Sequence, residues 1–275
     1  PSLKTPYTAL AVQTLMDQVL EKNGFSGVMS LVIGHDAEVG ETLIRDRRIP
    51  LVSATGSCRM GRHVGGVVAE RMGRSLLELG GNNALIVMED ADLDLALPAV
   101  VFGAVGTAGQ RCTTTRRLLL QKNIADAFIE RLLAAYTQVR VGNPLDEATL
   151  MGPLIDKDAV EHMQAALEKI RSEGGEVLYG GEVLEGTDHT GGCYVRPCVV
   201  RVESTMPMVK EETFAPILYV ITFDTLNEAI AIQNDVPQGL SSAIFTDSIR
   251  HGYRFISASG SDCGIANINI GTSGA

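Results

Sequence analysis

The chain has 275 residues, of which 45% are hydrophobic and 20% charged, and its formal net charge is −10 at pH 7. This length is enough for one large or two smaller domains. The negative charge argues against nucleic acid or an anionic membrane as a partner, and no apolar run reaches the ~18 residues of a membrane-spanning helix.

The first part of the chain alternates between helical and strand-like patterns. A helix is expected from Pro6 to the glycine at position 24, residues 28–33 form an apolar run typical of a buried strand, and residues 36–46 have a helical pattern. Residues 49–53 predict a second strand. This alternation predicts an α/β fold with a parallel sheet covered by helices.

A glycine-containing turn, Thr55-Gly56-Ser57, follows the second expected strand and precedes a helical stretch. Backbone N–H groups at such a helix start can hold a pyrophosphate. The chain contains no Gly-x-Gly-x-x-Gly and no Walker motif. The local sequence alone therefore favours an ordinary strand-to-helix turn.

Further along the chain, strand-like runs alternate with amphipathic helical patterns, and a glycine-rich loop interrupts them. Strands are expected at residues 84–88, 199–200 and 217–223, helices at residues 123–139, with Asn123 as the cap, and around residues 160–170, and the loop at residues 174–192. These helices are expected to pack on the core without taking part in chemistry.

A cysteine in a glycine-rich loop is the first candidate for chemistry. Gly109-Gln110-Arg111-Cys112 precedes a short apolar run, and small residues allow close approach of backbone or substrate. A positive charge at Arg111 favours the thiolate form of Cys112, as a nucleophile requires. A buried structural thiol is the alternative, and the local sequence does not decide between the two.

A glutamate provides a second candidate. Glu78 ends an apolar strand-like run and stands just before Gly80 and Gly81. A buried or half-buried glutamate is unusual unless it is paired or functional. The five cysteines form no Cys-x-x-Cys pair, so no metal site is expected, and reduced thiols favour a cytoplasmic protein. The scattered histidines give little support to a Cys/His protease.

Three motifs in this order resemble the aldehyde dehydrogenase superfamily: Glu-Leu-Gly-Gly-Asn at residues 78–82, Gly-Gln-Arg-Cys at residues 109–112, and Glu-x-Phe-x-Pro at residues 212–216. The resemblance implies that Cys112 attacks the aldehyde and that Glu78 activates water for hydrolysis of the thioester. It further implies that Glu212 holds the nicotinamide ribose and Phe214 flanks the nicotinamide.

The resemblance also implies which residues bind the cofactor phosphates and which bind the amino-acid end of the substrate. The Gly56-Ser57 turn is similar to the atypical dinucleotide-binding turn of the superfamily, which meets the cofactor phosphates. The arginine before the nucleophile and the final Thr-Ser-Gly-Ala resemble the branch that oxidises α-aminoadipic semialdehyde. In that branch these positions, here Arg111, Ser273, Gly274 and Ala275, bind the amino-acid end of the substrate.

The implied architecture is a partial Rossmann-like cofactor domain over residues 1–79, followed by an α/β catalytic domain over residues 80–275. The implied reaction is NAD-dependent oxidation of a small-molecule aldehyde, an amino-acid semialdehyde, to a carboxylic acid through a cysteine thiohemiacetal and thioester, with NADP not excluded. A homo-oligomer, a tetramer or dimer, is expected for the full-length protein.

Both ends of the sequence have the character of an internal fragment. The oxyanion-hole asparagine of the superfamily would precede Pro1, so we expect this chain alone to be a poor enzyme. Two alternatives remain. A CoA-acylating aldehyde dehydrogenase would usually lack the base at Glu78, and a non-catalytic fragment that binds nucleotide or pairs with intact subunits would retain all three motifs.

Overall fold

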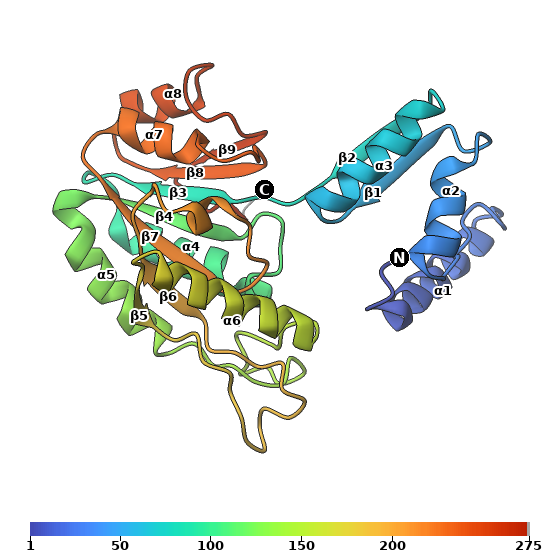
Figure 1. Cartoon of the computed structure of the whole chain (residues 1–275), viewed down its shortest axis with the longest axis horizontal. Coiled ribbons are helices and arrows are strands. Elements are labelled where there is room, and N and C mark those ends of the chain that lie inside the picture. The colour runs from blue at the N-terminus through green and yellow to red at the C-terminus, as the bar shows by residue number, and fades with distance from the viewer. Residues whose placement is uncertain (274–275) are drawn as a thin grey trace. The chain divides into compact units, whose positions relative to one another are not determined.

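The computed structural model describes residues 1–273 and divides into two compact units, Pro1–Leu79 and Gly80–Ala275 (Figure 1). The cofactor-binding and catalytic roles given to the two units remain proposals. No helix among residues 1–273 is both long and apolar enough to cross a membrane.

The first unit is small and carries one two-stranded parallel sheet. Its elements are α1 (Pro6–Lys22), a π-helical turn (Asp36–Gly40), α2 (Glu41–Arg45), β1 (Leu51–Thr55), α3 (Cys58–Glu70) and β2 (Arg74–Glu78). Strand β1 pairs with β2 in parallel. A cluster of aliphatic side chains joins α2 to α3: Ile44, Val64, Val67 and Val68.

The strand expected at residues 28–33 was a wrong prediction. This segment has no regular secondary structure, and its Val28 and Val32 side chains are 66% and 53% exposed. A strand needs a neighbouring strand to accept and donate its ladder hydrogen bonds, and the sheet of this unit contains only β1 and β2. The apolar run therefore lacks both the pairing and the burial that its sequence predicted.

The second unit is built on a seven-stranded sheet in the order β5-β6-β7-β4-β3-β8-β9. The strands are β3 (Asn83–Val87), β4 (Thr115–Gln121), β5 (Glu176–Tyr179), β6 (Cys198–Arg201), β7 (Ile217–Phe223), β8 (Ser241–Phe245) and β9 (Ile265–Ile268). All neighbours are parallel except β5 and β6. The expected α/β fold with a parallel sheet is confirmed.

Helices cover this sheet and complete its core (Figure 1). They are α4 (Leu93–Val105), α5 (Lys122–Tyr136), α6 (Lys157–Ser172), α7 (Leu226–Asn234) and α8 (Ile249–Ile256), with 3₁₀ turns at Gly106–Gly109 and Pro207–Lys210. Every residue of β3 and β8 is buried. Such burial on both faces explains the nearly continuous apolar runs of the central strands.

The helix expected at residues 123–139 lies at Lys122–Tyr136, but Asn123 is not its cap. Gln121 occupies the N-cap position and its side chain makes no capping hydrogen bond. The Asn123 amide instead contacts the Glu89 carboxylate. A true cap occurs at α4, where the Asp92 carboxylate accepts from the backbone N–H groups of the first turn.

Candidate active site

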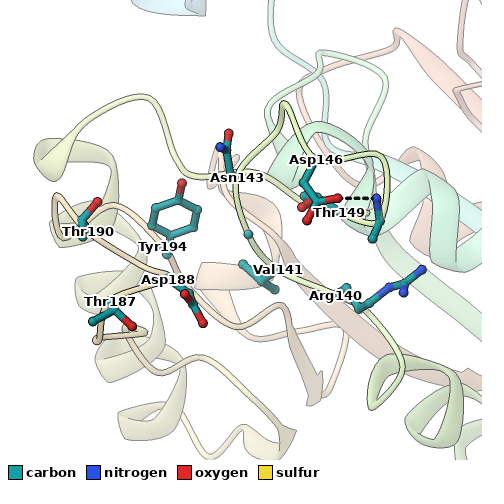
Figure 2. A pocket seen from close by; sticks show the side chains of 11 residues that line it. Arg140, Val141, Asn143, Asp146, Thr149, Thr187, Asp188, Thr190 and Tyr194 are labelled. Carbon is teal, nitrogen blue, oxygen red and sulfur yellow. Dashed lines mark hydrogen bonds between the residues drawn. The ribbon is translucent and has the colours of Figure 1, made fainter.

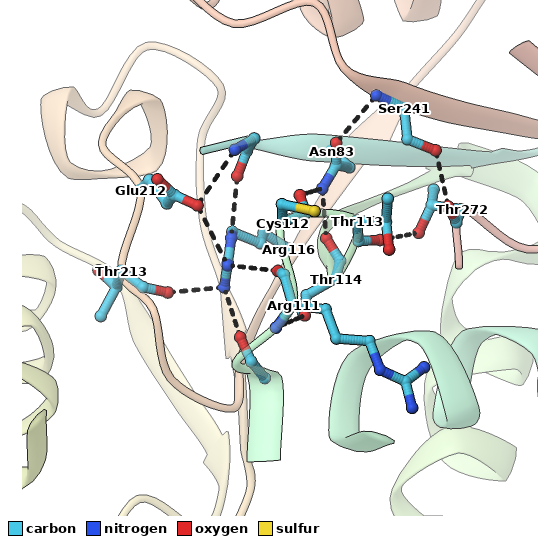
Figure 3. Close-up of polar contacts among 12 residues, drawn as sticks. Asn83, Arg111, Cys112, Thr113, Thr114, Arg116, Glu212, Thr213, Ser241 and Thr272 are labelled. Atoms are coloured by element: carbon cyan, nitrogen blue, oxygen red, sulfur yellow. Dashed lines mark hydrogen bonds and ion pairs between the residues drawn. The ribbon is translucent and has the colours of Figure 1, made fainter. Parts of the chain in front are cut away.

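The candidate site lies at the amino ends of neighbouring parallel strands. The loop that carries Cys112 leads into β4, and the Gly80–Asn82 segment leads into β3. The segment with Glu212 leads into β7, which pairs with β4. Because the amino ends of parallel neighbours meet at one edge of a sheet, three motifs that are distant in sequence come together there (Figure 3).

The nucleophile loop is held by one buried amide. Cys112 is half-buried, and its backbone carbonyl accepts a hydrogen bond from Asn83 Nδ2 at 2.7 Å. Asn83 also donates to the Thr114 carbonyl at 2.8 Å and accepts from the backbone N–H of Ser241 at 3.1 Å. One side chain at the start of β3 therefore fixes this loop against β8.

Two glycines allow the motifs to approach one another. A Cβ on Gly80 would lie 1.9 Å from Glu212 Oε2, and a Cβ on Gly81 would lie 2.5 Å from the carbonyl oxygen of Cys112. Any other residue at either position would displace one of these groups. The physical reason for Gly-Gly in the first motif is thus space for the other two motifs.

The third motif packs directly on the nucleophile loop. Gly109 has a φ of +70°, and a Cβ there would lie 2.3 Å from the Ala215 carbonyl oxygen. The Glu212 carboxylate is mostly shielded and accepts from the Gly81 backbone N–H at 3.1 Å. Phe214 is 47% exposed, so part of its ring is open to a ligand.

Arg116 connects all three motifs, although it was not among the site residues predicted from the sequence. Its guanidinium is buried and donates to the carbonyls of Gly81 (3.0 Å), Gly109 (3.1 Å), Thr213 (2.7 Å) and Arg111 (3.1 Å), and to Glu212 Oε1 at 3.3 Å (Figure 3). Two adjacent arginines directly before a buried apolar run were the available signal, because buried arginines are rare unless they are fully paired.

The charge of Arg116 is set by burial and by its partners. Burial lowers the pKa of the Arg116 guanidinium, and the Glu212 carboxylate and the Cys112 thiol act in the opposite direction. The guanidinium also stands 5.2 Å from the centre of the Phe214 ring. The cysteine, the glutamate and the phenylalanine of the expected site therefore all interact with this one cation.

The Arg111 side chain points away from the Cys112 thiol. Figure 3 shows it extending away from Cys112 towards α4, and its guanidinium lies 5.2 Å from the centre of the Phe102 ring. A pocket of about 470 Å³, lined mostly by apolar side chains of α4, includes Arg111 and Gly106. A second pocket, of about 420 Å³, includes Gln110 and Phe214. The nucleophile loop thus contributes residues to two separate pockets.

The end of the described chain lies against the nucleophile loop. The hydroxyls of Thr272 and Ser273 donate to the Thr113 carbonyl at 2.8 and 3.1 Å, and Thr272 Oγ1 is also 2.7 Å from Thr115 Oγ1. Ser273 therefore lies next to the nucleophile loop, and its role in substrate binding stays a prediction. Gly274 and Ala275 lie outside the described residues.

The remaining expected site residues belong to the first unit. Glu78 is exposed at the end of β2, and its backbone carbonyl accepts from the N–H of Gly56 at 3.0 Å. Ser57 caps α3, because its hydroxyl accepts from the backbone N–H of Met60 at 3.2 Å. The roles given to Glu78, Gly56 and Ser57 stay predictions.

A polar pocket of about 570 Å³ is formed by two loops of the second unit, residues 140–149 and 187–194 (Figure 2). Thr149 closes one of these loops by donating its backbone N–H to the Asp146 carbonyl. The pocket contains none of the expected site residues. Within residues 1–273, no group of three or more His, Cys, Asp or Glu side chains is arranged to hold a metal ion.

A model of the aldehyde dehydrogenase family matches residues 1–275. The α-aminoadipic semialdehyde dehydrogenase of Mus musculus is 49% identical over 98% of this chain and 50% of its own length. Aldehyde dehydrogenase family 7 member B4 of Arabidopsis thaliana is also 49% identical, over 98% of this chain and 53% of its own length.

Solved structures agree with these matches. Betaine aldehyde dehydrogenase from Staphylococcus aureus in complex with NAD⁺ has a TM-score of 0.87 at 31% identity and covers 92% of this chain and 50% of its own. A 3,6-anhydro-L-galactose dehydrogenase in complex with NAP has a TM-score of 0.93 at 33% identity. The match covers 98% of this chain and 56% of that structure's chain. The chain spans about half the length of the relatives it matches.

Proposed function

This chain belongs to the aldehyde dehydrogenase family, and from that premise we propose that it contributes the catalytic cysteine for NAD⁺-dependent oxidation of an aldehyde to a carboxylic acid. The solved relatives with NAD⁺ and with NAP support a nicotinamide dinucleotide as the cofactor, with NAD⁺ as our preferred form. A cytoplasmic location remains an expectation from the reduced thiols, and a homo-oligomer remains one from the family resemblance.

The proposed substrate is an amino-acid semialdehyde, and α-aminoadipic semialdehyde is the first to test. The relative from Mus musculus carries that substrate in its name. The Arg111 guanidinium offers a cation for a substrate carboxylate, and its pocket on α4 is mostly apolar, as an aliphatic chain requires. Ser273, beside the nucleophile loop, offers a hydroxyl for the same end of the substrate.

The residues present suit a nicotinamide dinucleotide. The half-exposed Phe214 ring offers a flat apolar face, and the nearby Glu212 carboxylate offers an acceptor for ribose hydroxyls. In the first unit, the start of the 13-residue helix α3 after Gly56-Ser57 offers backbone N–H groups for phosphate. When bound, the cofactor supplies the acceptor for the hydride that leaves the substrate.

The proposed reaction has two steps, oxidation of the aldehyde on Cys112 and hydrolysis of the resulting thioester. The Cys112 thiolate adds to the aldehyde carbonyl, and the backbone N–H of Cys112 contributes to holding the resulting oxyanion. After oxidation the acyl group remains on Cys112 as a thioester. Glu78 then takes a proton from water, the resulting hydroxide attacks the thioester, and the acid leaves with the thiolate restored.

One observation carries this proposal: Arg116 links the Cys112 loop, the glycine pair and the Glu212 segment in a single hydrogen-bonded cluster. The test is to supply the chain with α-aminoadipic semialdehyde and NAD⁺ and to measure NADH and α-aminoadipate together. Equal amounts of both products are expected. Acyl transfer to added CoA would favour an acylating enzyme, and nucleotide binding without product would favour a non-catalytic binding fragment.

A further inference from the structure

Arg116 uses its whole hydrogen-bonding capacity. A guanidinium has five N–H groups. Here Nε donates to Gly81, Nη1 donates to Gly109 and Thr213, and Nη2 donates to Arg111 and Glu212. Four of these acceptors are backbone carbonyls, so the interaction depends on where the backbone lies and not on which side chains it carries.

The five acceptors come from three segments that are far apart in sequence. Gly81 precedes β3, Gly109 and Arg111 flank the Cys112 turn, and Glu212 and Thr213 precede β7. No ladder hydrogen bond reaches across these segments, because all three lie before their strands begin. We propose that Arg116 is a positioning residue that fixes the Glu212 carboxylate and the Cys112 loop in one relative arrangement.

Charge and geometry together make the arrangement specific for arginine. The carboxylate of Glu212 is only 16% exposed, and Arg116 is 2% exposed at 3.3 Å from it. Loss of the guanidinium would leave the shielded carboxylate with only the Gly81 N–H, and it would remove a donor from four carbonyls, of which those of Thr213 and Arg111 keep the backbone N–H groups of Ala215 and Thr114. A lysine would restore the charge, but its single nitrogen cannot reach acceptors spread around a planar fork.

The inference rests on the proposed function only in giving Glu212 a role in cofactor binding. Its second consequence, the placement and reactivity of Cys112, is independent of that role. Arg116 donates to the carbonyl of Arg111, the residue before Cys112, so its loss would loosen the loop that holds the half-buried thiol.

Arg117 provides a matched control. It is equally buried, and its guanidinium donates to the carbonyls of Asn82, Ile232 and Gln233. It contacts neither Glu212 nor the nucleophile loop. Arg117→Gln thus removes a buried guanidinium from the same strand and is expected to cost comparable stability without disturbing the cluster.

The experiment compares the chain with R116Q, E212Q, the double variant R116Q/E212Q and the control R117Q. NAD⁺ affinity is measured by calorimetry, and the rate of Cys112 alkylation by iodoacetamide is measured by peptide mass spectrometry. R116Q is expected to weaken NAD⁺ binding about tenfold, and to speed alkylation about threefold because a loosened loop exposes the half-buried Cys112 more. R117Q should leave the alkylation rate unchanged at a similar melting temperature.

The double variant separates positioning from general destabilisation. If Arg116 acts on the cofactor through Glu212, R116Q/E212Q should bind NAD⁺ no more weakly than E212Q, and its melting temperature should exceed that of R116Q because no uncompensated carboxylate remains. Additive losses of affinity, or equal effects of R116Q and R117Q on alkylation, would overturn the inference.

The experiment also distinguishes a chain that does not bind NAD⁺ from an R116Q variant that does not fold. If the unmodified chain does not bind NAD⁺, the proposed function fails, and the alkylation rates of R116Q and R117Q alone decide the positioning role. If R116Q does not fold, R116K replaces it under the same criteria. Full retention of NAD⁺ affinity and alkylation rate in R116K would then overturn the requirement for a planar fork.

Discussion

The side-chain amide of Asn83 donates a hydrogen bond to the backbone carbonyl of Cys112 at 2.7 Å, so the candidate nucleophile is held through its own main chain by the first residue of a central strand. The same amide reaches Thr114, and its oxygen accepts from the Ser241 backbone N–H. The loop before β4 is thus attached to β3 and β8 by a single buried side chain.

Replacement of Asn83 should loosen this loop. Asn83→Ala removes three hydrogen bonds at a buried position and is expected to lower the free energy of unfolding by about 2–4 kcal/mol. Asn83→Asp keeps the acceptor for Ser241 but sets a carboxylate oxygen against two carbonyls, so it should be at least as harmful. Urea unfolding and amide exchange of residues 112–114 measure both effects. Unaltered exchange in these residues would contradict the role given to Asn83.

The space at Gly80 is expected to matter for the cofactor. An alanine Cβ would lie 1.9 Å from Glu212 Oε2, so Gly80→Ala must displace the carboxylate. Because a side-chain end can move, the stability cost should be only about 1 kcal/mol, whereas NAD⁺ affinity should fall at least about fivefold. Gly264→Ala is the control, since its Cβ would meet only ordinary contacts at 3.8 and 3.9 Å. Equal NAD⁺ affinities in the two variants would show that Glu212 placement is not important.

The sequence predicted those strands whose apolar residues are in fact buried in the folded chain. The apolar runs at residues 84–88 and 217–223 became the buried strands β3 and β7. The equally apolar run at residues 28–33 did not, because strand formation also requires a partner. The role of Arg116 could not be predicted for a similar reason: its acceptors are backbone carbonyls of loops that only the folded chain brings together.

Cys112 and Glu78 should separate the two steps of the reaction. Cys112→Ala should abolish NADH formation from the semialdehyde, because no thiol remains to form the thiohemiacetal. Glu78→Gln should leave a burst of NADH of about one equivalent followed by slow turnover, because oxidation precedes the hydrolysis that needs the base. Stopped-flow absorbance records both.

Cys263→Ala is the matched control, as this half-buried cysteine lies in the loop between α8 and β9, outside the proposed chemistry. It should retain the turnover of the unmodified chain. Turnover in Cys112→Ala would refute the nucleophile assignment. A Glu78→Gln variant without any burst would mean that Glu78 is needed before the thioester forms.

The buried thiol of Cys198 should make the second unit lose stability in mild alkali. Cys198 in β6 is fully buried, and burial raises its pKa from 9.0 to about 12. In the unfolded chain the thiol ionises near its ordinary value, so above pH ~9 the unfolded state binds fewer protons than the folded state and stability falls as pH rises, by up to about 1 kcal/mol per unit.

The pH window distinguishes this thiol from other buried acids. Tyr136 and Tyr219 also have raised pKa values because of burial, but their ordinary value of 10.0 keeps them protonated in the unfolded chain until higher pH. Urea midpoints at about pH 8, 9 and 10 should therefore decline in the unmodified chain and less steeply in Cys198→Ala. Cys193→Ala, at a half-buried position, should keep the decline of the unmodified chain. Parallel declines in Cys198→Ala and Cys193→Ala would mean that another group carries the alkaline loss of stability.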